Sequence, residues 1–145
     1  MSKLAELPGW AAELLESSRI ARLGLVDEAG HPRVLPITFA LATDRIWSAV
    51  DEKPKRARTA ELARVRFLRH DPRAAITVDR YSENWLELAW VQVLGPIRIV
   101  DAGETAEAAL GAASLADKYE PYRESPPPGP LLALEPERCI CWRAG

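Results

Sequence analysis

Three short segments near the N-terminus, joined by tight turns, constrain the fold of this chain more than any other feature. In each of them apolar side chains alternate with other residues, as in strands with one buried face. The three segments are residues 20–27, 33–41 and 45–50. The first connection contains Gly30, which can adopt a positive φ, and the second is the tight turn Ala42-Thr43-Asp44. Strands joined in this way predict an antiparallel meander.

Elsewhere in the chain, helical and strand patterns follow one another. Apolar residues at helical spacing predict three helices, at residues 4–16, 54–70 and 103–119. Further strands are expected at residues 74–80, 87–100, 131–134 and 138–143, and Gly95-Pro96 should bend or bulge the second of them. Hairpin-linked strands with interposed helices indicate an α+β fold based on an antiparallel barrel, not a doubly wound parallel sheet. No linker divides the chain, so a single domain over residues 1–145 is expected.

Composition excludes several classes of protein. Hydrophobic residues make up 48% of the 145 residues and charged residues 28%, which excludes a disordered or fibrous chain. No apolar run approaches the roughly 20 residues that span a bilayer, and the N-terminus lacks the apolar core of a secretion signal. With only two cysteines, no disulfide scaffold is possible. We therefore expect a cytoplasmic protein without a membrane partner.

The sequence offers no side chain with an evident catalytic or metal-binding role. It contains neither a glycine-rich phosphate loop nor the G-x-S-x-G motif of serine hydrolases. His31 and His70 fall in a turn and at a helix end, without clustered carboxylates, so we expect both to be exposed. Cys139 and Cys141 share one strand face without further ligands and are expected to be small buried residues. No metal site is predicted.

The distribution of charge is more informative than its total. Residues 52–73 contain eight basic and three acidic side chains, so this segment carries +5 while the whole chain carries -2. A positive field within an acidic protein favours a specific small anion over nucleic acid, because the remaining negative charge would repel a long polyanion. The alternative is a solvated basic helix face without a ligand.

Four of these cations lie within six residues of one another: Lys53, Lys55, Arg56 and Arg58. Pro54 is suited to the first turn of a helix, which would place the four cations at the positive end of the helix dipole. A bound phosphate or carboxylate would remove this conflict, because amides, dipole and side chains would all attract it. If the helix instead begins near Thr59, residues 51–58 form a solvated loop.

The segment Trp85-Leu86-Glu87-Leu88-Ala89-Trp90 contains two of the five tryptophans. On a regular strand Leu86, Leu88 and Trp90 share a face, so Trp85 must point elsewhere. One tryptophan could then cover the core while the other lines a pocket or a subunit interface. The alternative is that both tryptophans lie in the core.

In their order and spacing, several short stretches resemble the pyridoxamine 5'-phosphate oxidase-like split β-barrel family. These stretches are Gly30-His31-Pro32-Arg33-Val34-Leu35-Pro36-Ile37, Ala49-Val50-Asp51-Glu52-Lys53-Pro54-Lys55-Arg56, Asp71-Pro72-Arg73-Ala74-Ala75, Trp85 with Trp90-Val91, Lys118-Tyr119 with Tyr122-Arg123, and Pro126-Pro127 with Gly129-Pro130. The resemblance covers residues 20–142. Within the family it is nearest to the actinobacterial branch of deazaflavin (coenzyme F-420)-dependent enzymes.

This resemblance implies a split β-barrel that forms a homodimer and binds a cofactor in clefts between the subunits. The five tryptophans, more than a small monomer needs in its core, favour the same dimer. The family pattern also implies that the cofactor phosphate is held by Lys53, Lys55 and Arg56, with Arg58 as an additional contact. Backbone groups near residues 36–38 and 48–50 would lie against the ring system of the cofactor. The candidate contacts there are Pro36, Thr38, Ser48 and Val50.

The chemistry that the resemblance implies is that of an oxidoreductase, whose cofactor transfers hydride to or from a small organic substrate. No catalytic side chain is assigned, and the polar candidates for protonating a substrate are Thr38, Ser48 and Tyr81. Coenzyme F-420 is the expected cofactor and FMN the alternative, since both carry a ribityl phosphate. A non-catalytic cofactor-binding protein is a third hypothesis. Nucleic acid is not expected as a partner, because the basic segment is not interleaved with exposed aromatic residues.

Overall fold

The computed structural model of this chain describes residues 3–50 and 62–145. The strands are β1 (Ala21–Val26), β2 (Pro32–Ile37), β3 (Ala40–Ala42), β4 (Arg45–Ala49), β5 (Arg73–Arg80), β6 (Ala89–Val100), β7 (Leu131–Leu134) and β8 (Arg138–Arg143). The α-helices are α1 (Gly9–Ser17), α2 (Ala63–His70), α3 (Ala106–Lys118) and α4 (Glu120–Glu124), and short 3₁₀ turns are η1 (Leu4–Glu6) and η2 (Trp85–Glu87). Within the described ranges, every helix is too short or too polar to cross a membrane.

The strands form an antiparallel sheet that folds into two parts, in the order β2-β1-β5-β6-β7-β4-β3, with β8 beside β6. We call β2, β1, β5, β8 and the first half of β6 sheet A. Sheet B consists of β7, β4, β3 and the second half of β6. This α+β arrangement confirms the predicted fold class.

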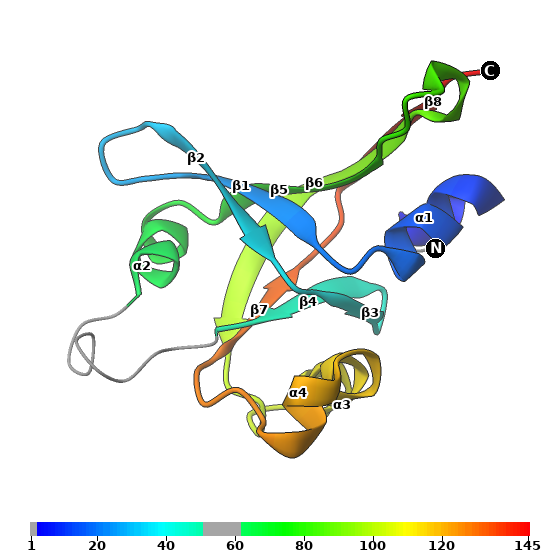
Figure 1. Cartoon of the computed structure of the whole chain (residues 1–145). Helices are drawn as coiled ribbons and strands as arrows, with labels where there is room; N and C mark the ends of the chain where they lie inside the picture. The colour runs from blue at the N-terminus through cyan, green and yellow to red at the C-terminus, as the bar shows by residue number, and fades with distance from the viewer. Residues whose placement is uncertain (1–2, 51–61) are drawn as a thin grey trace.

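The predicted interruption at Gly95-Pro96 corresponds to a change of partner within an unbroken strand. β6 pairs with β5 as far as Pro96 and with β7 from Ile97 onward. Figure 1 shows β6 curving through the molecule from one sheet into the other. The backbone of Glu135 passes so close to Gly95 that a Cβ at this position would lie 1.8 Å from the Glu135 carbonyl oxygen. A glycine is therefore required where the strand changes sheets.

The predicted meander differs from the structure in its second strand, because the expected strand over residues 33–41 is divided between β2 and β3. β1 and β2 form a hairpin, and in the described part of the chain β4 pairs with β3 across the predicted tight turn and with β7, but not with β2. The chain leaves sheet A after Ile37, turns at Thr38 and Phe39, and enters sheet B at Ala40. The alternation of apolar residues continues through this turn, so the local pattern does not reveal that the strand has ended.

The first core fills the space between the two sheets. Strand residues such as Leu23, Val91 and Leu132 meet there, all of them buried. α1 and α2 also pack against this core, and Figure 1 shows them on opposite sides of the barrel. The residues they contribute are Ala11 and Leu15 from α1 and Val65, Phe67 and Leu68 from α2. The two helices therefore close the barrel by burying apolar faces against its interior.

The second core lies on the outer face of sheet B, where α3 covers Trp47 of β4. Trp47 is fully buried, and its indole N–H donates to the carbonyl of Ala42 at 2.9 Å. A Cβ at Gly111 of α3 would lie 2.3 Å from the Trp47 ring, so the helix backbone rests directly on the indole. The packing of a helix on this face fixes the position of β4 in the barrel.

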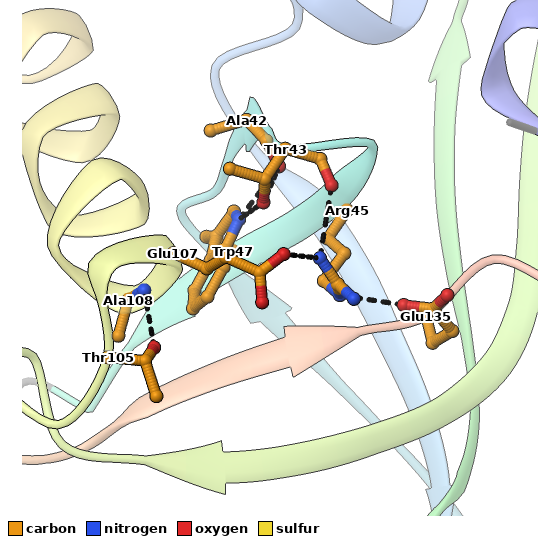
Figure 2. A network of polar contacts seen from close by, with 8 residues as sticks. All are labelled: Ala42, Thr43, Arg45, Trp47, Thr105, Glu107, Ala108 and Glu135. Atoms are coloured by element: carbon orange, nitrogen blue, oxygen red, sulfur yellow. Dashed lines mark hydrogen bonds and ion pairs between the residues drawn. The ribbon is translucent and has the colours of Figure 1, made fainter.

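A polar network reinforces the attachment of α3 to β4 (Figure 2). The guanidinium of Arg45 donates to the carboxylate of Glu107 on α3 at 2.7 Å and lies 2.7 Å from that of Glu135, which follows β7. These two carboxylates raise the pKa of Arg45 although desolvation lowers it. At the start of α3, the Thr105 side chain accepts the N–H of Ala108 at 3.0 Å and caps the helix.

Candidate functional site

The turn between β2 and β3, which we call the corner, consists of Thr38 and Phe39. Phe39 is fully buried, whereas Thr38 is half-buried. The hydroxyl of Ser48 on β4 donates to the carbonyl of Thr38 at 2.7 Å. The structure thus brings together two of the predicted contacts, Thr38 and Ser48, by a hydrogen bond between neighbouring elements of the barrel.

Two tyrosines hold the corner from the side of α3 and α4. The Tyr119 hydroxyl accepts a hydrogen bond from the Phe39 N–H at 3.1 Å. Its own proton has two possible acceptors, the Phe39 carbonyl at 3.0 Å and the Arg19 carbonyl at 2.8 Å. The Tyr122 hydroxyl lies 2.8 Å from the Thr38 hydroxyl. Burial raises the pKa of Tyr119, so its hydroxyl remains a donor. Tyr119 and Tyr122 are therefore functional candidates. In the sequence, only the Lys118-Tyr119 and Tyr122-Arg123 stretches of the family resemblance point to them.

Val50 lies apart from the corner, at the end of β4. Its N–H donates to the carbonyl of Pro130 at 3.0 Å, and its side chain is buried in the first core. Val50 and Leu62, which flank residues 51–61 in the chain, both line a pocket of about 460 Å³. The other lining residues are Val65, Arg69, Ile99, Val100, Asp101, Glu104 and Pro130. The two described residues on either side of residues 51–61 thus line one pocket.

Pro36, the remaining described candidate, lies on the opposite side of the sheet from the core. Leu35 and Ile37 face the barrel interior, so the alternation of β2 turns Pro36 outward, where it is exposed opposite Arg22 of β1. Pro36 and Val50 therefore do not meet. Of the four predicted ring contacts, Thr38 and Ser48 thus form a pair at the corner. Pro36 is exposed and Val50 is buried, and both lie apart from this pair.

The predicted phosphate contacts Lys53, Lys55, Arg56 and Arg58 lie outside the described residues. The expectation of a continuous helix over residues 54–70 is wrong, because Leu62 has extended backbone and α2 begins at Ala63. The four cations are therefore separated from the first turn of α2 by several residues.

The outer face of sheet A is a feature of the structure that the sequence did not indicate. The strand register aligns one row of side chains across all five strands: Pro36, Arg22, Thr77, Gln92 and Ile140. The amide of Gln92 donates to the hydroxyl of Thr77 at 3.0 Å in the middle of this row. The adjacent row contains Val34, Gly24, Ala75, Leu94 and Arg138. None of these described residues belongs to either core, since α1 and α2 pack on the inner face and α3 on sheet B.

Exposed aromatic side chains gather beyond one end of this face. The prediction that Leu86, Leu88 and Trp90 share a strand face is wrong, because Trp85–Glu87 form the turn η2, which the Asn84 side chain caps by accepting the Leu86 N–H. Trp85 is 68% exposed and Leu86 73% exposed. Tyr81 and Trp142 are also exposed, and Trp142 pairs with Trp90 across β8 and β6. Trp85 is thus a surface residue and not part of the core.

The histidines and cysteines take no part in the corner or the pocket. His31 and His70 are exposed, as predicted, and Cys139 and Cys141 are half-buried against the first core. Burial raises the pKa of the Cys139 thiol. Over residues 3–50 and 62–145, no three His, Cys, Asp or Glu side chains are grouped as a metal ion would require.

Comparison with solved structures identifies several with the same fold. A conserved hypothetical protein from Mycobacterium tuberculosis superposes with a TM-score of 0.75 at 19% identity, covering 99% of this chain and 88% of that one. A FAD-binding protein from Mesorhizobium loti gives 0.71 at 15% identity, covering 96% of each chain. The heme storage protein HutZ from Vibrio cholerae gives 0.72 at 15% identity, covering 100% of this chain and 96% of that one. At these identities the likeness shows the fold alone.

Sequence comparison assigns the family. The comparison with curated proteins finds no match. A family model described as pyridoxamine 5'-phosphate oxidase matches residues 7–143, which include every strand of both sheets. The chain therefore belongs to the pyridoxamine 5'-phosphate oxidase family and has its split β-barrel fold.

Proposed function

We propose that this chain is an oxidoreductase that binds a cofactor with a ribityl phosphate and transfers hydride between it and a small organic substrate. The observation that carries the proposal is the group of four cations at residues 53–58, which only Asp51 and Glu52 separate from Val50 at the end of β4. In a chain whose total charge is -2, such a group favours a phosphate, because paired hydrogen bonds from arginine suit phosphate oxygens. When bound, the cofactor supplies the hydride-transferring ring, and the protein supplies binding and orientation.

The proposed contacts divide between the phosphate and the ring. Lys53, Lys55 and Arg56 would hold the phosphate, with Arg58 as an additional contact. The backbone near Pro36, Thr38, Ser48 and Val50 would lie against the ring. The corner suits this role because Thr38 is held on two sides, by Ser48 and by Tyr122. A rigid contact surface reduces the entropy lost when a ligand binds.

We propose coenzyme F-420 as the cofactor, with FMN as the alternative. Both carry the ribityl phosphate that the basic segment would hold. F-420 also carries an anionic tail, for which Arg58, Arg64 and Arg66 offer further positive charge beyond the phosphate. The FAD-binding protein from Mesorhizobium loti shares the fold and supports a flavin-type cofactor of either kind.

Titration of the purified protein with F-420, FMN and hemin tests the proposal. Quenching of the fluorescence of the five tryptophans gives each dissociation constant. We expect F-420 to bind most tightly and its affinity to fall with added salt more steeply than that of FMN, because more charges are paired at an exposed site. Equal salt slopes for the two would favour FMN. Binding of hemin alone would contradict the proposal and indicate heme storage, the role of HutZ.

We also propose that two copies associate through the outer face of sheet A. At its centre, side chains of β5 and β6 are half-buried but belong to neither core, namely Ala75, Thr77, Gln92 and Leu94. Among the described residues, nothing therefore prevents this face from packing against a partner. The exposed Trp85, Leu86 and Trp142 would extend the contact, since aromatic residues are enriched at interfaces. Such a dimer would bring the exposed Pro36 of one copy close to the second copy.

The dimer is testable with a single charged substitution. Ala75→Arg places a guanidinium in the half-buried centre of the face and should convert a dimer into a monomer at micromolar concentration, measured by light scattering. The same substitution at Ala113, exposed on α3, is the matched control and should leave the mass unchanged. A stable interface of this kind should bury about 2,000 Å² or more. A monomeric wild type at this concentration would contradict both the dimer and an intersubunit cofactor cleft.

A further inference from the structure

Lys118, the last residue of α3, places an ammonium group where no described residue accepts a hydrogen bond from it. Its Nζ is buried and unpaired within the described part of the chain. It lies 3.9 Å from the centre of the Phe39 ring and 5.5 Å from that of Tyr119. The aromatic faces attract the cation but cannot accept its three N–H groups as oxygen atoms would. The charge of Lys118 is thus directed at the corner.

The surroundings of Lys118 disfavour its charge. Desolvation and the nearby Arg19 lower the pKa of Lys118 to about 8, while Glu16 at the end of α1 acts in the opposite direction. Arg19 donates to the Lys118 carbonyl at 2.8 Å. Glu16 and Asp117 line a cavity of about 270 Å³ together with Lys118, and Arg123 of α4 donates to the Asp117 carbonyl. The amine therefore changes its charge within the range of pH at which the protein can be studied.

The charge of Lys118 destabilises the folded protein. A neutral side chain of similar length would avoid this destabilisation. A lysine whose pKa is lower in the folded than in the unfolded protein reduces the free energy of unfolding. The whole of this reduction applies at pH values below the folded pKa of about 8. This penalty fades as the pH rises towards the unfolded value of 10.5. Lys118→Met should therefore raise the Tm at pH 7 and raise it less at pH 10. Stability alone does not account for a lysine at this position.

We propose that Lys118, Tyr119 and Tyr122 form a clamp on the corner, and that the protonated amine of Lys118 holds the corner in the conformation that binds the cofactor. The proposal rests on the proposed function, because Thr38 is one of the proposed cofactor contacts. The clamp touches both corner residues: Lys118 and Tyr119 hold Phe39, and Tyr122 holds Thr38. It gives a structural role to the Lys118-Tyr119 and Tyr122-Arg123 stretches.

The link from Lys118 to the proposed site is short. Loss of the proton removes the attraction between the amine and the Phe39 ring. The N–H and the carbonyl of Phe39 both lie at the Tyr119 hydroxyl, so a shift of the ring strains the contacts of the corner backbone. Thr38 is the adjacent residue and accepts the Ser48 hydroxyl through its carbonyl. The protonation state of Lys118 is thus transmitted to Thr38 across one peptide bond.

The first experiment needs no cofactor. In ¹⁵N-labelled protein titrated from pH 6.5 to 9.5, the amide signals of Phe39 and Ala40 should shift with a midpoint near 8, the pKa of Lys118. They should not shift over this range in Lys118→Met. Lys3→Met is the matched control, because Lys3 is exposed, and it should titrate like the wild type. Corner amides that do not titrate in the wild type would overturn the clamp, whatever the protein binds.

The second experiment measures the affinity for F-420 and for FMN over the same range of pH. Wild type should bind about threefold to tenfold more weakly at pH 9 than at pH 7, as expected for the loss of one cation–π contact. Lys118→Met should bind at pH 7 as weakly as the wild type does at pH 9, and Lys118→Arg should remove the step at pH 8. Tyr122→Phe should weaken binding at every pH, because it frees Thr38 without changing the titration.

The two proposals fail in different ways. Failure of the wild type to bind either cofactor would contradict the proposed function, while the amide titration would still test the clamp. Binding of the cofactor with the same pH profile in wild type and Lys118→Met would leave the function in place and overturn the coupling to Lys118.

Discussion

The Lys55→Ala/Arg56→Ala protein is expected to bind its cofactor at least about a hundredfold more weakly than the wild type. Each charge-assisted hydrogen bond to a phosphate contributes about 1.5–3 kcal/mol, and the double substitution removes at least two of them. A hundredfold loss corresponds to about 2.7 kcal/mol. The free energy of unfolding should change by only a few tenths of a kcal/mol, because isolated surface charges contribute little to stability. Fluorescence titration and the thermal shift on adding cofactor measure the two effects separately.

A control with the same change of charge makes this result specific. Lys3→Ala/Arg98→Ala also removes two positive charges, both from exposed described positions away from the corner. We expect its affinity for the cofactor to stay within about twofold of the wild type, since long-range attraction is largely screened at physiological salt. If the Lys55→Ala/Arg56→Ala protein keeps the full wild-type thermal shift on adding cofactor, the phosphate is bound elsewhere.

Replacement of Gly95 by alanine should destabilise the fold by more than about 4 kcal/mol. The added Cβ would lie 1.8 Å from the Glu135 carbonyl oxygen and 2.9 Å from its carbonyl carbon. Both are backbone atoms, held in place by hydrogen bonds between Glu135 N–H and the Pro96 carbonyl and between Glu137 N–H and the Leu94 carbonyl. The clash cannot be relieved by rotating a side chain, so the connection between β7 and β8 must move away from β6. Urea denaturation followed by tryptophan fluorescence gives the free energy of unfolding.

Gly103 provides the matched control for this substitution. A Cβ at Gly103 would meet no atom within 4 Å, and its φ is not in the left-handed region. Gly103→Ala should therefore change the free energy of unfolding by no more than about 0.5 kcal/mol in either direction. Gly95→Ala with the same stability as Gly103→Ala would show that Glu135 does not approach β6 so closely.

The candidate site was only partly predictable from the sequence. Thr38 and Ser48 were expected on the resemblance, and the structure joins them through one hydrogen bond. The unpaired amine of Lys118 was not expected, because a lysine at the end of a helix is ordinarily solvated and stabilised by the helix dipole. Whether such a lysine is buried depends on residues far away in sequence, here Phe39, which approaches it from the corner.

Local rules determined which segments of this chain form strands and helices. Alternation with a period of two identified β1, and other strand-like patterns identified β5, β7 and β8. Gly30, with a φ of 87°, makes the first hairpin turn. The helix expected over residues 103–119 corresponds to α3, which Thr105 caps, and Asp71-Pro72 follows the end of α2. These features depend on a few neighbouring residues, which is why the sequence alone determined them.

The tertiary structure decided which strands pair and where the chain changes sheets. A strand pattern states which face is buried but not which partner lies beside it, because the same backbone hydrogen bonds can be made with any strand. β4 therefore pairs with β7, more than 80 residues away, and not with β2, from which only two turns and the short β3 separate it. The corner at Thr38 and Phe39 exists because Tyr119, 80 residues further along the chain, satisfies the backbone groups that leave the sheet there.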